Sequence, residues 1–192
     1  MRQWGFGQIR GGEWDLPRHR RDLEDNWVVV GLRQRFEEGR DWKDTVYYEQ
    51  ARQQFIEGNS KWNYENIDQF IEVRCAYVDD LYRLIRDVGY RPNDEGRHDV
   101  PEQDVRSTEY EQRFEPLVVI GRDGDVLLED GRHRVAIAKI LDIESIPANV
   151  LGRHREWQRV RDTLARVRTR SEVDPTLRTH LGHPDLTDIS LG

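Results

Sequence analysis

The sequence predicts an α/β (α+β) protein in which a small sheet is preceded by an N-terminal helical region. Apolar residues spaced three and four apart before residue 89 predict the helices. Two apolar runs, 117–120 and 126–128, flank a turn centred on Asp123-Gly124 and predict a β-hairpin. Residues from about 115 to 155 therefore predict strand, turn, strand, loop, helix and strand, in that order.

Three helical segments are expected before the hairpin. They span about 24–38, 45–57 and 65–88. The second begins after Asp44 or Thr45 as N-cap and ends at Gly58, a common arrangement of helix ends. We expect the third to be broken near Cys75 and to end at Gly89, three residues before a proline.

The remaining segments divide into regular and irregular parts. A helix is expected over 135–141, a strand over 146–151 and another helix over 156–169. Residues 1–22 predict an irregular leader whose bulky apolar side chains lie across the folded body, residues 93–112 a long loop, and the chain beyond Ser171 a loosely held tail. The expected domains are a leader and helical region (1–64), a core (65–155) and a C-terminal helix with its tail (156–192).

Composition limits the classes of function. The net charge of −7 and the pI of about 5.4 disfavour DNA as a partner unless a local basic patch binds it. Cys75 is the only cysteine, which excludes an internal disulfide and a cysteine-based zinc cluster, and its apolar neighbours predict a buried, inert thiol. The chain shows neither a signal peptide nor an apolar run that could span a membrane, so we expect a cytoplasmic protein without a membrane partner.

The chemistry is concentrated in Asp130-Gly131-Arg132-His133-Arg134. A helix that opens directly after a strand and a glycine presents free backbone amides and the positive end of its dipole, which together favour an anion. Gly131 permits close approach, and Arg132 and Arg134 can bind phosphate oxygens. His133 could donate a proton or a hydrogen bond, or simply pack; Asp130 could hold Mg²⁺ or accept a proton. Alternatively, the arginines form a solvated surface and Asp130 is only an N-cap.

The run EPLVVIGRDGDVLLEDGRHRVAIAKILDIESIPANV, residues 115–150, resembles the core of the ParB/sulfiredoxin superfamily. That core has a strand, a turn, a strand, a D-G-x-x-R loop, an Ala-rich helix and an I-P-V strand. The resemblance implies a ParB/sulfiredoxin-like small mixed sheet with helices, over the 65–155 core, and a loop that binds phosphate.

The branches of this superfamily differ in their loop residues. Sulfiredoxins carry a catalytic cysteine where this chain has Arg132, so their chemistry is excluded. Chromosome-partitioning ParB proteins, which bind CTP and DNA, carry G-E-R-R-x-R-A; the acidic residue and the last arginine are missing here, and no helix-turn-helix region follows. Free-serine kinases carry D-G-H-T-R, with which Asp130, Gly131 and Arg134 align. That resemblance implies Asp130 near the transferred phosphoryl group and Arg134 on the phosphates, although the kinase's substrate-reading glutamate has no counterpart that we can locate. The residues IGRDG, DGRHR, IAK and RHREWQ, in this order along the chain, are also similar to uncharacterised archaeal proteins.

Other segments offer weaker candidates. Arg153 and His154 follow the last strand and could contribute to the ligand from the same rim, or form an exposed helix start. The segments Gly12–Asp15 and Gly39–Trp42 could cover the site, but we favour the interpretation that their tryptophans pack on the folded body. His98-Asp99 could join Asp130 at a metal or be solvated, and His180 and His183 are expected to be incidental.

The sequence thus predicts a ParB-like protein that binds a nucleotide or another phosphorylated small molecule. Its activity would be Mg²⁺-dependent phosphoryl transfer from a nucleoside di- or triphosphate to a small hydroxyl compound. Asp130 and His133 are the candidate catalytic residues; Gly131, Arg132, Arg134, Arg153 and His154 would bind the nucleotide. The alternatives are a non-catalytic nucleotide- or DNA-binding module, a ParB-like nuclease, and a structural protein that has kept the fold without the site.

Overall fold

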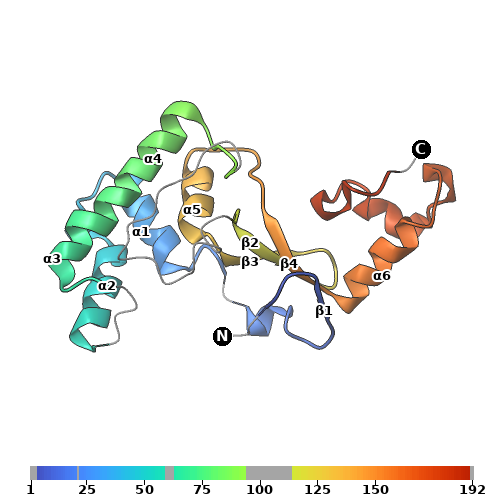
Figure 1. The fold of residues 1–192 in the computed structure, drawn as a ribbon, viewed down its shortest axis with the longest axis horizontal. Coiled ribbons are helices and arrows are strands. Elements are labelled where there is room, and N and C mark those ends of the chain that lie inside the picture. Colours follow the sequence, from blue (N-terminus) through green and yellow to red (C-terminus); the bar gives the residue numbers. More distant parts are fainter. Residues whose placement is uncertain (1–3, 21, 59–62, 94–113, 191–192) are drawn as a thin grey trace. The chain divides into compact units, whose positions relative to one another are not determined.

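The computed structural model describes residues 4–20, 22–58, 63–93 and 114–190 of the chain. Over these residues the protein is α/β, with six α-helices and a four-stranded mixed sheet in the order β1-β4-β2-β3 (Figure 1). The strands are β1 (Gln8–Arg10), β2 (Leu117–Ile120), β3 (Val126–Asp130) and β4 (Asn149–His154). The α/β class, the mixed sheet and the helical region before it agree with the sequence-based prediction.

The chain divides into two compact units, and neither is continuous in sequence. One unit, termed the sheet unit, comprises 1–20, 118–129 and 150–192; the other, the helical unit, comprises 21–117 and 130–149. The three consecutive segments expected from the sequence have different boundaries, and they stay a prediction.

The helical unit contains five of the helices. These are α1 (Trp27–Phe36), α2 (Val46–Ile56), α3 (Ile67–Gln69), α4 (Ala76–Val88) and α5 (Arg132–Ile140). Helix α1 packs against α2 and α5, and α4 also contacts α5. Their core includes Leu32, Tyr47, Phe70, Ile85 and Ile137, each almost fully buried.

The predicted helix ends are largely confirmed. The Thr45 hydroxyl accepts a hydrogen bond from the Tyr48 amide at the start of α2, and α4 ends at Gly89, whose φ is 82°. The break expected near Cys75 takes the form of a change in helix type. The helical chain passes through a π-helical turn, Phe70–Cys75, and α4 begins at Ala76.

The hairpin is confirmed, although two flanking elements begin at other residues than expected. The Gly121 amide donates to the Asp125 carbonyl to close the turn, and β3 continues to Asp130. Strand β4 begins at Asn149 rather than residue 146, because Pro147 has no amide to donate and pairing starts where the Asn149 amide reaches the Pro116 carbonyl. Helix α5 begins at Arg132 rather than residue 135.

The irregular leader expected over residues 1–22 contains a strand. β1 runs parallel to β4, with Gln8 opposite Gly152 and Arg10 opposite His154. Three residues are too few to show strand alternation, so this strand depends on its neighbour in the sheet. The expectation that the bulky leader residues pack on the body is confirmed for Trp14, which is buried with its ring 4.8 Å from that of Trp4. It is wrong for Phe6 and Ile9, which are 47% and 52% exposed.

The C-terminal part also differs from expectation. Helix α6 (Arg155–Leu164) ends five residues earlier than expected. The chain beyond it is not a loose tail: 3-10 turns follow at 170–172, 175–180 and 184–186. Val173 and Leu186 are buried in one cluster with Trp157 of α6 and Ile120 of β2. Val173 and Leu186 stand among polar residues without a helical or strand spacing, so the sequence pattern does not predict that they are buried.

None of the helices in the described part of the chain combines the length and the apolar character that crossing a bilayer requires.

Candidate anion-binding site

The predicted loop forms the junction between β3 and α5. Gly131 stands at the N-cap of α5 with φ 90° and ψ 22°, and it supplies no side-chain cap. A Cβ at this position would lie 2.8 Å from the Pro116 Cα atom. Glycine is therefore required twice, for the left-handed backbone and for the close approach to Pro116.

Asp130 is the last residue of β3, and its side chain is exposed. One carboxylate oxygen, Oδ1, accepts a hydrogen bond of 2.8 Å from the Gly131 amide. No cluster of three or more metal-ligating side chains occurs among the described residues. Any cation held by Asp130 would thus need its other ligands from water or from a bound phosphate.

His133 lies in a polar cluster inside the helical unit. The fully buried Tyr47 places its hydroxyl 3.0 Å from His133 Nε2, and this hydroxyl accepts a hydrogen bond from Arg74 Nε at 3.1 Å. Because the guanidinium can only donate, the hydroxyl can in turn donate to Nε2. The ring thus lies between two donors, the Tyr47 hydroxyl and the Arg74 guanidinium, and is assigned as neutral because only a ring nitrogen without a proton can accept.

The electrostatics of this cluster agree with that assignment. Burial, and then the positive charges of Arg74 and Arg132, hold the pKa of His133 well below its usual value of 6.5. Arg74 is itself buried, and its Nη2 lies 3.3 Å from both ring nitrogens. Of the three roles considered for His133, packing with hydrogen bonding is the one that its contacts describe.

The two arginines of the loop have different surroundings. Arg132 is half-buried in the first turn of α5. Arg134 is held within the helical unit: its Nη2 donates to the Phe114 carbonyl at 2.8 Å, and its Nη1 lies 3.3 Å from Asn93 Oδ1 and 3.5 Å from Glu115 Oε2. The Tyr90 hydroxyl donates to the same Glu115 oxygen at 2.7 Å. Arg134 thus joins the end of α4 to the start of β2.

Arg153 and His154 belong to the sheet unit, where their polar atoms have partners. Arg153 donates two hydrogen bonds to the buried Asp185, at 2.8 and 2.6 Å. His154 is buried; its Nε2 donates to the Gly12 carbonyl at 3.0 Å, and its Nδ1 accepts from the Glu156 amide and so caps α6. Both residues therefore stabilise the sheet unit, and their predicted role toward a nucleotide stays a prediction.

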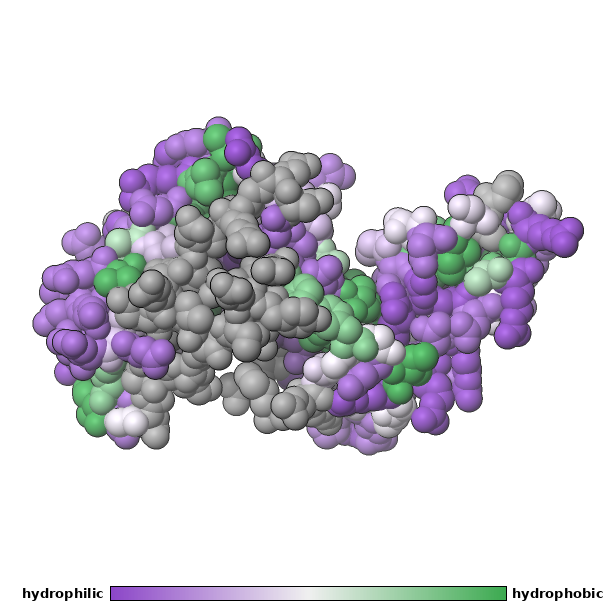
Figure 2. Space-filling model, in the orientation of Figure 1, coloured by the Kyte–Doolittle hydropathy of each residue, from purple (hydrophilic) through white to green (hydrophobic). Residues whose placement is uncertain are grey.

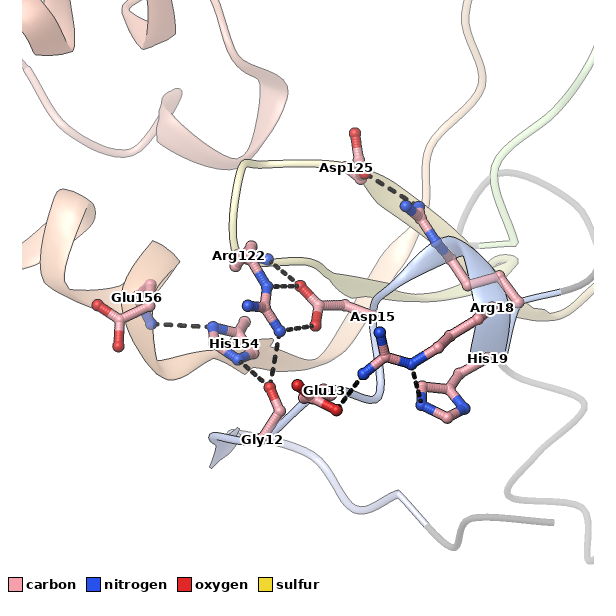
Figure 3. Close-up of polar contacts among 10 residues, drawn as sticks. Gly12, Glu13, Asp15, Arg18, His19, Arg122, Asp125, His154 and Glu156 are labelled. Atoms are coloured by element: carbon pink, nitrogen blue, oxygen red, sulfur yellow. Dashed lines mark hydrogen bonds and ion pairs between the residues drawn. The ribbon is translucent and has the colours of Figure 1, made fainter.

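Figure 3 shows how the leader is attached to this unit. The guanidinium of Arg122 faces the carboxylate of Asp15 across two hydrogen bonds of 2.8 and 2.9 Å, and it also donates to the Gly12 carbonyl. Burial alone would raise the pKa of Asp15, but the hydrogen bonds from the Arg122 side chain and amide hold it well below its ordinary value.

The two tryptophan segments and the remaining histidines are the last candidates from the sequence. Trp14 and Trp42 are buried, as the packing interpretation predicts. His98-Asp99 lies outside the described residues. His183 is not incidental: its Nδ1 accepts from the Asp185 amide, and its Nε2 donates to the Gly124 carbonyl.

Cys75 is fully buried, and burial raises the pKa of its thiol to about 12, as expected for an inert thiol.

Several residues of the polar clusters were missed from the sequence. Tyr47 follows the helical spacing of a core residue and gives no sign of its polar role. Arg74 does give a signal, because it is a lone arginine between Val73 and Cys75 on an apolar helical face. Asp185 follows a proline in a segment whose composition predicts a loosely held tail.

No protein-family model, curated protein or solved structure matches this chain.

Proposed function

We propose that this protein binds a phosphate ester, with a nucleotide as the expected ligand, where β3 meets α5. The observation that carries the proposal is the cationic start of α5. The helix opens at a glycine without a side-chain cap, and Arg74 and Arg132 both act electrostatically on His133 in its first turn. Helix amides and guanidinium groups together favour a phosphate.

The depressed pKa of His133 supports a positive potential at this point. Burial is the largest cause, and the two arginines add to it. A third cation, Arg134, lies in the same turn and faces Glu115. Three guanidinium groups against the carboxylates of Asp130 and Glu115 leave this part of the protein positive, in a chain whose net charge is −7.

Each loop residue has a distinct role in the proposal. Gly131 supplies the left-handed backbone from which α5 opens, and Arg132 binds the phosphate oxygens. Arg134 adds positive charge while it positions the chain around Phe114 through its carbonyl contact. His133 is a neutral packing partner that orients the first turn of α5 through Tyr47.

Phosphoryl transfer is the activity that we propose to test at this site. The supporting observation is the exposed Asp130 carboxylate, one residue before the left-handed glycine. Mg²⁺ is commonly held by one or two carboxylates together with substrate phosphates, so this lone carboxylate fits the ion only when a nucleotide is bound. Mg²⁺ would then neutralise charge on the phosphates, and Asp130 would hold it or accept the proton of a small hydroxyl compound.

The order β2, turn, β3, glycine loop, α5 and β4 is that of the ParB/sulfiredoxin core, which supports the proposed membership in that superfamily. The competing function is a ParB-like module that binds nucleotide without catalysis. It is favoured by the neutral His133, which cannot serve as a general acid at neutral pH with its Nε2 occupied by Tyr47.

Thermal unfolding with ATP, ADP, CTP and inorganic phosphate, each with and without Mg²⁺, tests binding. A ligand present at about 100 times its Kd stabilises by about 2.7 kcal/mol, which corresponds to a rise of roughly 5–10 °C in Tm. Arg132→Gln should abolish the rise, whereas Arg52→Gln, an exposed arginine paired with Glu49 on α2, should keep it. A rise that survives Arg132→Gln, or no rise with any ligand, contradicts the proposal.

Catalysis is tested separately. Nucleotide hydrolysis and transfer to a panel of small hydroxyl compounds should be lost in Asp130→Asn while the ligand-induced Tm rise persists. Binding without turnover in the unmodified protein would favour the non-catalytic module.

A further inference from the structure

The sheet unit carries a concentration of arginines that the proposed function does not use. Residues 153–170 contain seven arginines and only two carboxylates, a net charge of +5 in a chain whose total is −7. Two of these arginines, Arg153 and Arg161, are only partly exposed and bind Asp185. The others lie along α6 and the chain that follows it.

Three of them, Arg166, Arg168 and Arg170, share one arrangement. They are exposed, and they alternate with the half-buried Val167 and Thr169. The chain here runs between the last turn of α6 and the 3-10 turn at 170–172, and Thr169 is extended. The alternation therefore presents the three guanidinium groups to solvent from the same short segment, which we call the arginine segment (166–170).

These guanidinium groups make no ion pair or side-chain hydrogen bond with any residue that the structure describes. Three exposed arginines of the helical unit behave differently: Arg52 pairs with Glu49, Arg83 with Asp80 and Arg86 with Asp87.

The carboxylates that follow the arginine segment are already engaged. Glu172 accepts a hydrogen bond from the Arg168 amide, and Asp174 accepts one from the Thr176 amide. Neither carboxylate forms an ion pair with the three guanidinium groups in the part of the chain that the structure describes.

We propose that the arginine segment binds the sugar–phosphate strand of a nucleic acid. Guanidinium groups match phosphate oxygens, and three of them exposed within five residues can reach neighbouring phosphates along a strand.

Two other polyanions fit the segment less well. Binding at a membrane surface needs exposed apolar side chains, and the large exposed apolar residues of the described chain all lie before residue 127. Protein interfaces combine arginine with buried Trp or Tyr anchors, and the arginine segment contains no aromatic residue. Figure 2 shows the region of α6 and the following chain as mostly hydrophilic.

This function is independent of the site at α5, and fluorescence anisotropy of the full chain tests it. The probes are a labelled 20-nucleotide single-stranded RNA, a single-stranded DNA of the same sequence, and the duplex of that DNA. Comparing them shows which kind of nucleic acid the segment binds. Three phosphate contacts predict that affinity falls about 20-fold between 50 and 200 mM salt for the single-stranded probes and about 40-fold for the duplex. Replacing all three arginines (R166Q/R168Q/R170Q) should lower the affinity at least about tenfold and flatten the salt dependence.

The matched control is R52Q/R83Q/R86Q, which removes the same charge from exposed positions of the helical unit. It should keep most of the affinity, and circular dichroism should show both triple variants folded. The proposal is overturned if no probe binds at 50 mM salt, or if both variants lose affinity equally. Binding only to anionic vesicles or to a poly-glutamate peptide would also overturn it.

Discussion

Arg122 holds Asp15 through both carboxylate oxygens, across 107 residues of sequence. The Arg122 amide adds a third hydrogen bond of 2.7 Å to the same carboxylate. The pair joins the leader, which also contains β1, to the turn of the β2–β3 hairpin. It therefore stabilises the packing of the leader on the hairpin, which no local sequence preference predicts.

The first prediction concerns this pair and its dependence on pH. The folded-state pKa of Asp15 is depressed below its unfolded value, so its contribution to stability is full above about pH 4 and is lost as the pH falls further. Asp15→Asn should lower the Tm by several degrees at pH 7, with the difference from the unmodified protein shrinking below pH 4. Thermal unfolding from pH 2 to 8 measures this; a difference independent of pH would contradict it.

The second prediction concerns the protonation of His133. Its depressed pKa means that the unfolded chain takes up a proton near pH 6.5 and the folded chain does not. Stability should therefore fall as the pH drops below about 6.5. The NMR shifts of the His133 ring should stay unchanged between pH 7.5 and 5.5, whereas titration of that ring near 6.5 would show that the cluster is assigned wrongly.

The third prediction concerns the hydroxyl between Arg74 and His133. Tyr47→Phe removes the acceptor of Arg74 Nε and the donor to His133 Nε2, both in buried surroundings. We expect a loss of about 1–3 kcal/mol in the free energy of unfolding. Tyr48→Phe, at the next position of α2, is the matched control and should cost less than about 0.5 kcal/mol; equal losses would remove the special role of Tyr47.

The fourth prediction concerns Gly131. Gly131→Ala adds a Cβ at 2.8 Å from Pro116 Cα to a residue with φ 90°, so it should destabilise by roughly 2–3 kcal/mol. Gly58→Ala has a similar positive φ, 65°, and no atom within 4 Å of the added Cβ. It should cost only about 1 kcal/mol, which isolates the effect of the contact. Chemical denaturation compares the two, and similar losses would contradict the steric argument.

The fifth prediction concerns the anchor of the C-terminal chain. Asp185 is 4% exposed and binds Arg153 and the Trp157 ring nitrogen. Asp185→Asn leaves the Arg153 charge poorly compensated and should cost about 3 kcal/mol. It should also speed proteolysis within residues 170–190. Asp188→Asn, where the side chain is 66% exposed and pairs with Arg161, should change neither measurement appreciably.

Local signals in the sequence were sufficient for the helices of the helical unit and for the hairpin. Thr45, Gly58 and Gly89 mark helix ends through backbone requirements that operate within a few residues. The same holds for Gly131: a glycine between a strand and a helix predicts the turn, although its close contact with Pro116 is visible only in the fold.

Tertiary structure alone decided which distant residues meet. β1 exists because β4 pairs with it, and the C-terminal chain is ordered because Asp185 and Leu186 find partners on α6. The neutral state of His133 depends on Tyr47 and Arg74, 86 and 59 residues away. Sequence by itself determined the periodic elements and the cationic loop, because these depend on neighbours along the chain. Burial and ion pairing depend on neighbours in space, and only the folded chain supplies those.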